Sequence, residues 1–258
     1  MTTEPTEAER PGQAPKHYRR GIYLLPSILT VGNMFCGYAC IMFAMRGDLA
    51  TAAPFIGFAF VLDMLDGRIA RMTNTTSAFG LEFDSLADVI SFGLAPAVLA
   101  FAWGLSELGR VGWAVGFVYV TAAAMRLARF NIQTTGQSDK RYFIGMPSPA
   151  AAGVIASTIF AWPYPLIGYP QAIAAIAIVL VPATLMVSTI RFRSFKTINL
   201  GWTPSYMAIP LFAGLIVLIA TKPNITLVLL AYGYLLSAFI ELAVTRLRPH
   251  RADPPPAG

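Results

Sequence analysis

The most informative segment of this sequence reads Asp63-Met-Leu-Asp66-Gly67-Arg-Ile-Ala70-Arg71 and, eight residues later, Gly80-Leu-Glu-Phe-Asp84-Ser-Leu-Ala-Asp88. This window holds five of the chain's 13 acidic residues, although 56% of the 258 residues are hydrophobic. Carboxylates near or inside a bilayer are costly, so they mark a functional site and need a partner. Four aspartates that recur at i, i+3 and i, i+4 spacing therefore suggest a metal site in a membrane protein.

Long apolar segments recur along the rest of the chain. The mean hydropathy is +0.60 and only 12% of the residues are charged, which excludes an ordinary soluble domain. Eight segments are candidates to cross the ~30 Å hydrocarbon core of a bilayer. They lie at 23–45, 51–70, 85–105, 111–131, 149–167, 171–189, 205–221 and 225–245. The sequence predicts an all-α integral membrane protein, a polytopic helical bundle of about eight transmembrane helices within residues 21–245.

The lysines and arginines favour one side of this predicted topology. With the N-terminus in the cytoplasm, 16 of the 19 lie on the inner side, and the exceptions are Arg46, Arg110 and Lys222. Such a bias follows the positive-inside rule. We therefore expect a protein of the inner (cytoplasmic) membrane whose aspartates face the cytoplasm. Residues 1–20 and the proline-rich residues 246–258 are expected to form mobile tails.

Helical geometry brings the aspartates together. If residues 58–71 and 80–95 are helical, each segment presents one polar stripe. The first stripe holds Asp63, Asp66, Gly67, Ala70 and Arg71, and the second holds Gly80, Asp84 and Asp88. The polar turn 72–79 between them predicts antiparallel neighbouring helices. We expect the four carboxylates to converge on one point.

An all-oxygen set of carboxylates suits Mg²⁺, Mn²⁺ or Ca²⁺ better than zinc. A cation would also remove the repulsion between four anions, and two ions could be held if a carboxylate bridges them. Two such ions commonly clamp a diphosphate during its transfer. Gly67 and Gly80 leave room for a nucleotide or a partner helix. Arg71 could bind phosphate, and Ser77 could bond a sugar or a phosphate.

Three other interpretations of the same residues stay open at this point. The glycines and alanines could serve helix packing alone. Arg71 could pair with an aspartate and fix the topology. The aspartates could also form the cation or proton site of a transporter.

The complete pattern resembles the signature of the CDP-alcohol phosphotransferase family. All eight fixed positions are present in Asp63-x2-Asp66-Gly67-x2-Ala70-Arg71-x8-Gly80-x3-Asp84-x3-Asp88. The resemblance implies a membrane enzyme with a six-helix catalytic core, commonly a homodimer. Such an enzyme displaces CMP from a CDP-alcohol with a hydroxyl nucleophile and needs Mg²⁺ or Mn²⁺.

Carried over by position, the resemblance also implies roles for individual residues. Asp63, Asp66 and Asp84 would bind the metals, and Asp88 would complete the metal site and act as general base. The implied contacts to the CDP moiety come from Gly67, Ala70, Arg71, Ser77 and Gly80.

Further segments look like those of bacterial-type phosphatidylserine synthases within that family. They are Arg19-Arg20-Gly-Ile-Tyr-Leu-Leu-Pro26, Thr30-x2-Asn33, Phe83-Asp-Ser-Leu-Ala-Asp-Val-Ile-Ser-Phe-Gly-Leu-Ala-Pro96, Arg126-Leu-Ala-Arg129-Phe-Asn131 and Phe143-Ile-Gly-Met-Pro-Ser-Pro149. The resemblance implies CDP-diacylglycerol and L-serine as substrates, in contact with membrane lipids and without nucleic acid.

Serine is a zwitterion, so its pocket needs a cation for the carboxylate. Arg126, Arg129, Lys140 and Arg141 are candidates for that cation, and Asn131 could bond the ammonium or the carboxylate. The same residues also fit topology-determining charges or contacts with lipid headgroups. Another acceptor, as in phosphatidylglycerophosphate synthase, equally needs basic residues, so the identity of the acceptor stays open.

Overall fold

The computed structural model describes residues 24–73, 77–135, 142–188, 191–193 and 205–247. The predicted N-terminal tail, Lys140 and Arg141 lie outside these residues. The predicted C-terminal tail lies outside them too, except that its first two positions still belong to the last helix.

The described chain is almost entirely helical. Its helices are α1 (Leu24–Met45), α2 (Leu49–Thr73), α3 (Ala78–Asp88), α4 (Ala95–Trp103), α5 (Arg110–Thr135), α6 (Ser148–Ala161), α7 (Tyr169–Val187), α8 (Ser205–Thr221) and α9 (Pro223–Leu247). The π-helical segment η1 (Val89–Leu94) joins α3 to α4, and the 3₁₀ turn η2 (Leu105–Leu108) follows α4. Every predicted span contains a helix, which confirms the all-α bundle.

One short pair of strands was not predicted. β1 (Tyr142–Ile144) pairs antiparallel with β2 (Arg191–Arg193), so that Phe143 lies opposite Phe192. The two segments are 49 positions apart at these partners in the sequence, and no local pattern links them. The pair ties the chain that precedes α6 to the chain that follows α7.

Five helical segments of the described chain are long and apolar enough to cross a membrane. They are Pro26–Met45, Leu49–Thr73, Ala78–Trp103, Arg110–Ile132 and Tyr169–Val187. Large apolar side chains on their outer surfaces are exposed, including Phe35, Phe58, Trp113 and Phe117. Such surfaces suit a lipid environment and would be unfavourable in water.

Two predicted boundaries are wrong. The predicted span 149–167 contains only the 14-residue α6, about 21 Å long, because prolines at 163 and 165 follow its end at Ala161. The predicted turn 72–79 is shorter than expected: α2 continues through Thr73 and α3 already begins at Ala78.

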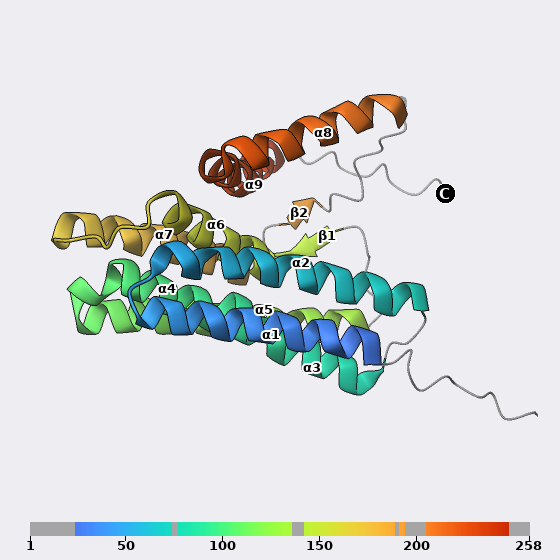
Figure 1. Ribbon diagram of the computed structural model, residues 1–258, viewed down its shortest axis with the longest axis horizontal. Coiled ribbons are helices and arrows are strands. Elements are labelled where there is room, and N and C mark those ends of the chain that lie inside the picture. The colour runs from blue at the N-terminus through green and yellow to red at the C-terminus, as the bar shows by residue number, and fades with distance from the viewer. Residues whose placement is uncertain (1–23, 74–76, 136–141, 189–190, 194–204, 248–258) are drawn as a thin grey trace, which may run out of the picture.

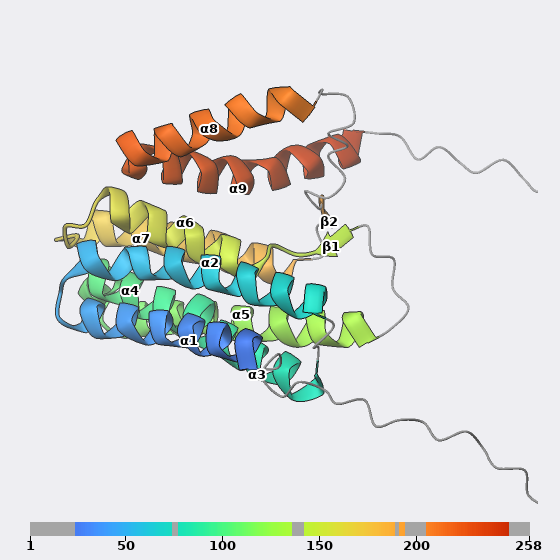
Figure 2. The same cartoon turned by 45° about the vertical axis from the view of Figure 1, so that its right-hand side comes forward.

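The helices form a layered bundle in which α1 lies beside α2 (Figures 1 and 2). α1 packs along α2 and also contacts α3, η1 and α4. α6 packs on α2. The pair α8–α9 lies on the other side of α6, and α9 is the helix of the pair that contacts it. The start of α1, the end of α2, the start of α3 and the end of α5 all lie at one end of the bundle.

The three basic residues that the predicted topology places on the outer side lie at the opposite end of the bundle. Arg46 follows α1, Arg110 begins α5, and Lys222 lies between α8 and α9. These three connections are at the end away from the α2–α3 turn (Figure 2). The helix order therefore agrees with the separation of charge on which the predicted topology rests.

Candidate active site

Three of the four predicted aspartates meet at the end of the bundle that holds the α2–α3 turn. Asp63 and Asp66 come from α2 and Asp84 comes from α3, and each offers a carboxylate oxygen within 4.8 Å of the others. Asp66 is buried, with 3% of its surface exposed. We call these three residues the aspartate trio.

The trio has the properties of a cation site. Three carboxylates this close repel one another, and burial strengthens the repulsion. Asp84 Oδ1 is buried and has no hydrogen-bond partner among the described residues. An acceptor of this kind is costly to leave unpaired. The donor set contains oxygen alone, so the residues present fit a hard divalent cation.

α1 holds the two aspartate helices together. It packs against both α2 and α3, whereas direct packing between α2 and α3 is slight. The two helices are therefore not packed directly on each other as predicted, although the connection between them is short as expected. The carboxylates need space between the helices that carry them, and α1 closes one side of that space.

α1 also contributes two polar side chains that lie three residues apart. The Thr30 hydroxyl lies 3.1 Å from both Asp66 Oδ2 and the Pro26 carbonyl oxygen. Asn33 Nδ2 donates to Asp88 Oδ1 at 3.3 Å. Both residues are buried. In the sequence they belong to a segment that resembles the family, and polar side chains at helical spacing inside an apolar span are also a signal in themselves.

Asp88, the fourth predicted aspartate, lies beside the trio and is not one of its members. It is 8% exposed and ends α3 immediately before η1. It interacts electrostatically with Asp63 and Asp84. A π-helical turn of this kind is frequent at functional sites, because it changes which side chains face a neighbouring helix.

Arg126 of α5 is a positively charged side chain that interacts with these carboxylates. Its Nη1 donates to Ser148 Oγ at 3.0 Å, and its guanidinium lies 5.3 Å from the centre of the Phe130 ring. It interacts electrostatically with Asp88, Tyr234 and Asp63. The structure therefore brings this predicted residue to the site.

The two other described residues predicted to bind serine connect helices. Arg129 Nη1 donates to the carbonyl oxygen of Val187, the last residue of α7, at 3.2 Å. Asn131 Nδ2 donates to Ser85 Oγ on α3 at 2.8 Å. These bonds fix α5 against α7 and against the helix that carries Asp84.

The residues predicted to contact CDP lie on α2 and at the start of α3, and their surroundings differ. Ser77 is the N-cap of α3, and its Oγ accepts from Gly80 N at 3.0 Å, a role that serine before a helix often has. Within the described part of the chain, a Cβ at Gly67 would meet Arg71 Nη2 alone, at 3.9 Å. Arg71 is exposed in the last turn of α2, and Ala70 is half-buried. Among the described residues, no neighbouring backbone therefore crowds Gly67 on this flank of α2.

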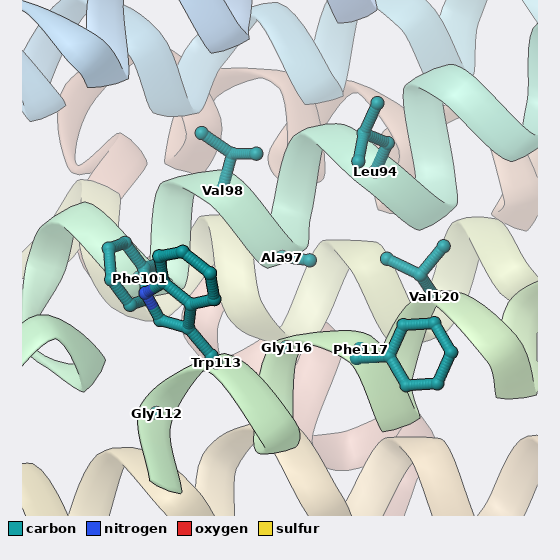
Figure 3. A pocket seen from close by; sticks show the side chains of 9 residues that line it. All are labelled: Leu94, Ala97, Val98, Phe101, Gly112, Trp113, Gly116, Phe117 and Val120. Atoms are coloured by element: carbon teal, nitrogen blue, oxygen red, sulfur yellow. The ribbon is translucent and has the colours of Figure 1, made fainter. Parts of the chain in front are cut away.

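An apolar groove elsewhere is distinct from this site. It has a volume of about 470 Å³ and lies between α4 and α5 (Figure 3). Phe101 and Trp113 meet edge to face at one part of it, with ring centres 6.4 Å apart. The residues that line it are apolar, aromatic or glycine, so they offer no charged side chain that would bind a diphosphate.

Gly37 allows α1 to approach η1 closely. A Cβ at this position would lie 2.6 Å from Ser91 Oγ and 2.8 Å from Ser91 Cα, and Ser91 Oγ donates to the Asn33 carbonyl oxygen at 2.9 Å. Gly37→Ala is therefore expected to push the helices apart and to destabilise the protein by about 1–3 kcal/mol. Thermal unfolding in detergent measures the effect.

Gly57→Ala on α2 is the matched control for this prediction. Within the described part of the chain nothing lies within 4 Å of a Cβ at Gly57. Since alanine favours a helix over glycine, this control should leave the midpoint unchanged or raise it slightly. Equal midpoints for the two variants would contradict the close approach of α1 and η1.

Comparison with known proteins connects this geometry to a family. The family model described as CDP-alcohol phosphatidyltransferase matches residues 23–190, which run from α1 to the end of α7 and include all four aspartates. The chain is 41% identical over 179 residues to the CDP-diacylglycerol–serine O-phosphatidyltransferase of Helicobacter pylori, covering 69% of this chain and 75% of that one.

Two further relatives are more distant. Identity is 35% over 172 residues to the protein of the same name from Bacillus subtilis, covering 67% of this chain and 91% of that one. Identity to the archaetidylserine synthase of Methanothermobacter thermautotrophicus is also 35%, over 170 residues, covering 65% of this chain and 69% of that one. The family model and these identities extend over most of the bundle, so the chain belongs to the CDP-alcohol phosphatidyltransferase family.

Proposed function

We propose that this membrane enzyme is a phosphatidylserine synthase, which transfers the phosphatidyl group of CDP-diacylglycerol to the hydroxyl of L-serine and releases CMP. The observation that carries the proposal is the aspartate trio with Asp88 and Arg126 beside it. The names of the relatives at 35–41% identity support the choice of serine as acceptor.

The trio is our candidate for binding the divalent cation, with Mg²⁺ or Mn²⁺ as the expected ion. Asp63, Asp66 and Asp84 would be ligands, and a second ion could be held if a carboxylate bridges and Asp88 takes part. When bound, the cation neutralises charge on the diphosphate and on the departing CMP. Gly67, Ala70, Arg71, Ser77 and Gly80 lie close to the trio in the sequence and are our candidates for contacts with the CDP moiety.

Asp88 is our candidate for the general base. Its carboxylate accepts the proton of the serine hydroxyl while the hydroxyl oxygen forms a bond to the phosphorus that carries diacylglycerol. The bond from that phosphorus to the CMP oxygen breaks, and CMP leaves with the electron pair. Asn33 donates to Asp88 Oδ1 and so holds the carboxylate in place during this step.

Arg126 is our candidate for binding the serine carboxylate. Its hydrogen bond to Ser148 and its contact with Phe130 hold the guanidinium toward Asp88. Arg129 and Asn131 would then act indirectly, because their hydrogen bonds hold α5 against its neighbours. A guanidinium in a fixed position suits a carboxylate.

We also infer that the protein lies in the inner membrane with the aspartates toward the cytoplasm. The positive-inside rule supports this orientation, since Arg46, Arg110 and Lys222, the basic residues predicted to lie on the outer side, are at the opposite end of the bundle. A homodimer is proposed on the family resemblance alone.

An assay of CMP release tests the function. Purified protein in detergent receives CDP-diacylglycerol and, in turn, L-serine, glycerol 3-phosphate and inositol phosphate. We expect release with L-serine, abolition by EDTA and recovery on addition of Mg²⁺ or Mn²⁺. Release only with glycerol 3-phosphate would contradict the serine assignment. No release with any acceptor, together with ion flux in vesicles, would indicate a transporter.

A further inference from the structure

Asn33 carries a buried amide oxygen without a partner. The residue is fully buried, and its Oδ1 makes no hydrogen bond within the part of the chain that the structure describes. Buried polar atoms are satisfied in the great majority of native proteins, so an exception at a functional site points to a missing ligand. The oxygen is an acceptor only, so its ligand is either an N–H or O–H donor or a cation.

The orientation of this amide follows from its neighbours. Asn33 Nδ2 faces Asp88 Oδ1 at 3.3 Å, and a flipped amide would place two acceptors against each other. The backbone is fixed too, since the Asn33 carbonyl oxygen accepts from Ser91 Oγ at 2.9 Å. Oδ1 is thus the atom left for a ligand, beside the carboxylate that is our candidate base.

We infer that Asn33 Oδ1 accepts a hydrogen bond from the ammonium group of the acceptor alcohol, which makes Asn33 a residue that determines specificity. The inference rests on the proposed function. In serine the hydroxyl and ammonium groups are on adjacent carbons. A hydroxyl held at Asp88 therefore places the ammonium close to the amide that contacts the same carboxylate.

This arrangement divides the recognition of the acceptor between three elements. Asp88 of α3 receives the hydroxyl, Asn33 of α1 receives the ammonium, and Arg126 of α5 remains for the carboxylate. An amide oxygen suits the ammonium because it accepts the N–H without adding a fifth carboxylate to the site. Acceptors without an ammonium group leave this oxygen unpaired and are disfavoured.

The test compares two acceptors that differ only in the ammonium group. L-Serine and 3-hydroxypropanoate share the hydroxyl and the carboxylate. We expect the wild-type protein to prefer serine in kcat/KM. Asn33→Ala should lower kcat/KM for serine by about 10- to 100-fold more than for 3-hydroxypropanoate, so that the preference is largely lost.

A second variant keeps the test decisive if Asn33→Ala does not fold. Asn33→Asp retains an acceptor oxygen of the same shape but loses the donor to Asp88. It should lower kcat for both acceptors and keep the preference for serine. Ser157→Ala is the control for loss of a buried polar group, because among the described residues Ser157 Oγ bonds the Val154 carbonyl oxygen of its own helix alone. This control should leave kcat/KM unchanged for both acceptors.

Two results would overturn the inference while leaving the proposed function intact. In the first, Asn33→Ala lowers kcat/KM by the same factor for both acceptors, which would mean that Asn33 only positions Asp88. In the second, Asn33→Ala keeps the preference but needs more Mg²⁺ or Mn²⁺, which would assign the oxygen to the cation's surroundings. A wild-type protein that releases no CMP with serine would instead refute the proposed function.

Discussion

Asp88→Asn is expected to lower serine-dependent CMP release by about 10²- to 10⁴-fold, because an amide cannot accept the proton of the attacking hydroxyl. The measurement is the initial rate with saturating CDP-diacylglycerol and L-serine in detergent. The variant should fold, since asparagine has the size of aspartate and the change removes one charge from a group of neighbouring carboxylates. A thermal midpoint at or above that of the wild type checks this point.

Asp48→Asn is the matched control. Asp48 is exposed in the α1–α2 turn at the other end of the bundle, and its Oδ1 accepts from Thr51 N at 3.1 Å. Asparagine caps a helix about as well as aspartate, so neither rate nor stability should change. A wild-type rate in Asp88→Asn would exclude this residue as the base.

Asp66→Asn is expected to weaken the binding of Mg²⁺ or Mn²⁺ and to lower the rate by at least ~10²-fold. Asp66 is the most buried member of the trio, and an amide oxygen is a much weaker ligand than a carboxylate. The measurement is the rise in the thermal midpoint on addition of Mn²⁺, because a ligand that binds the folded state stabilises it. This readout does not depend on turnover.

Thr30→Val provides a graded comparison for the same measurement. It keeps the shape of the side chain and removes the hydroxyl that lies 3.1 Å from Asp66 Oδ2. Partners of metal ligands typically affect metal affinity by 10- to 100-fold, so the stabilisation by Mn²⁺ should be reduced but still present. If Mn²⁺ stabilised Asp66→Asn as much as the wild type, the trio would not be the cation site.

The helices that carry the aspartates could be predicted because their determinants are local. Hydropathy located α2 and the long segment from α3 to α4, and the helical repeat placed Asp63 and Asp66 on one face. The position of the short turn followed from its polar residues. Its exact length did not, because the capping hydroxyl of Ser77 starts α3 earlier than the apolar pattern indicates.

Other parts of the site depend on contacts between distant segments. Asn131 and Ser85 are 46 residues apart, and Arg129 and Val187 are 58 residues apart. Nothing in the local sequence shows that these side chains bond other helices. The position of Arg126 opposite Asp88 likewise follows from the packing of α5 against η1.

The membrane bundle and the grouping of carboxylates follow from hydropathy and helical spacing over a few turns, and the family signature is a local motif. The position of α1 against both aspartate helices, which brings Thr30 and Asn33 to Asp66 and Asp88, depends on contacts between segments far apart in the chain. The physical reason is close packing: Gly37 lets α1 reach η1, and which faces meet depends on the shapes of helices distant in the chain.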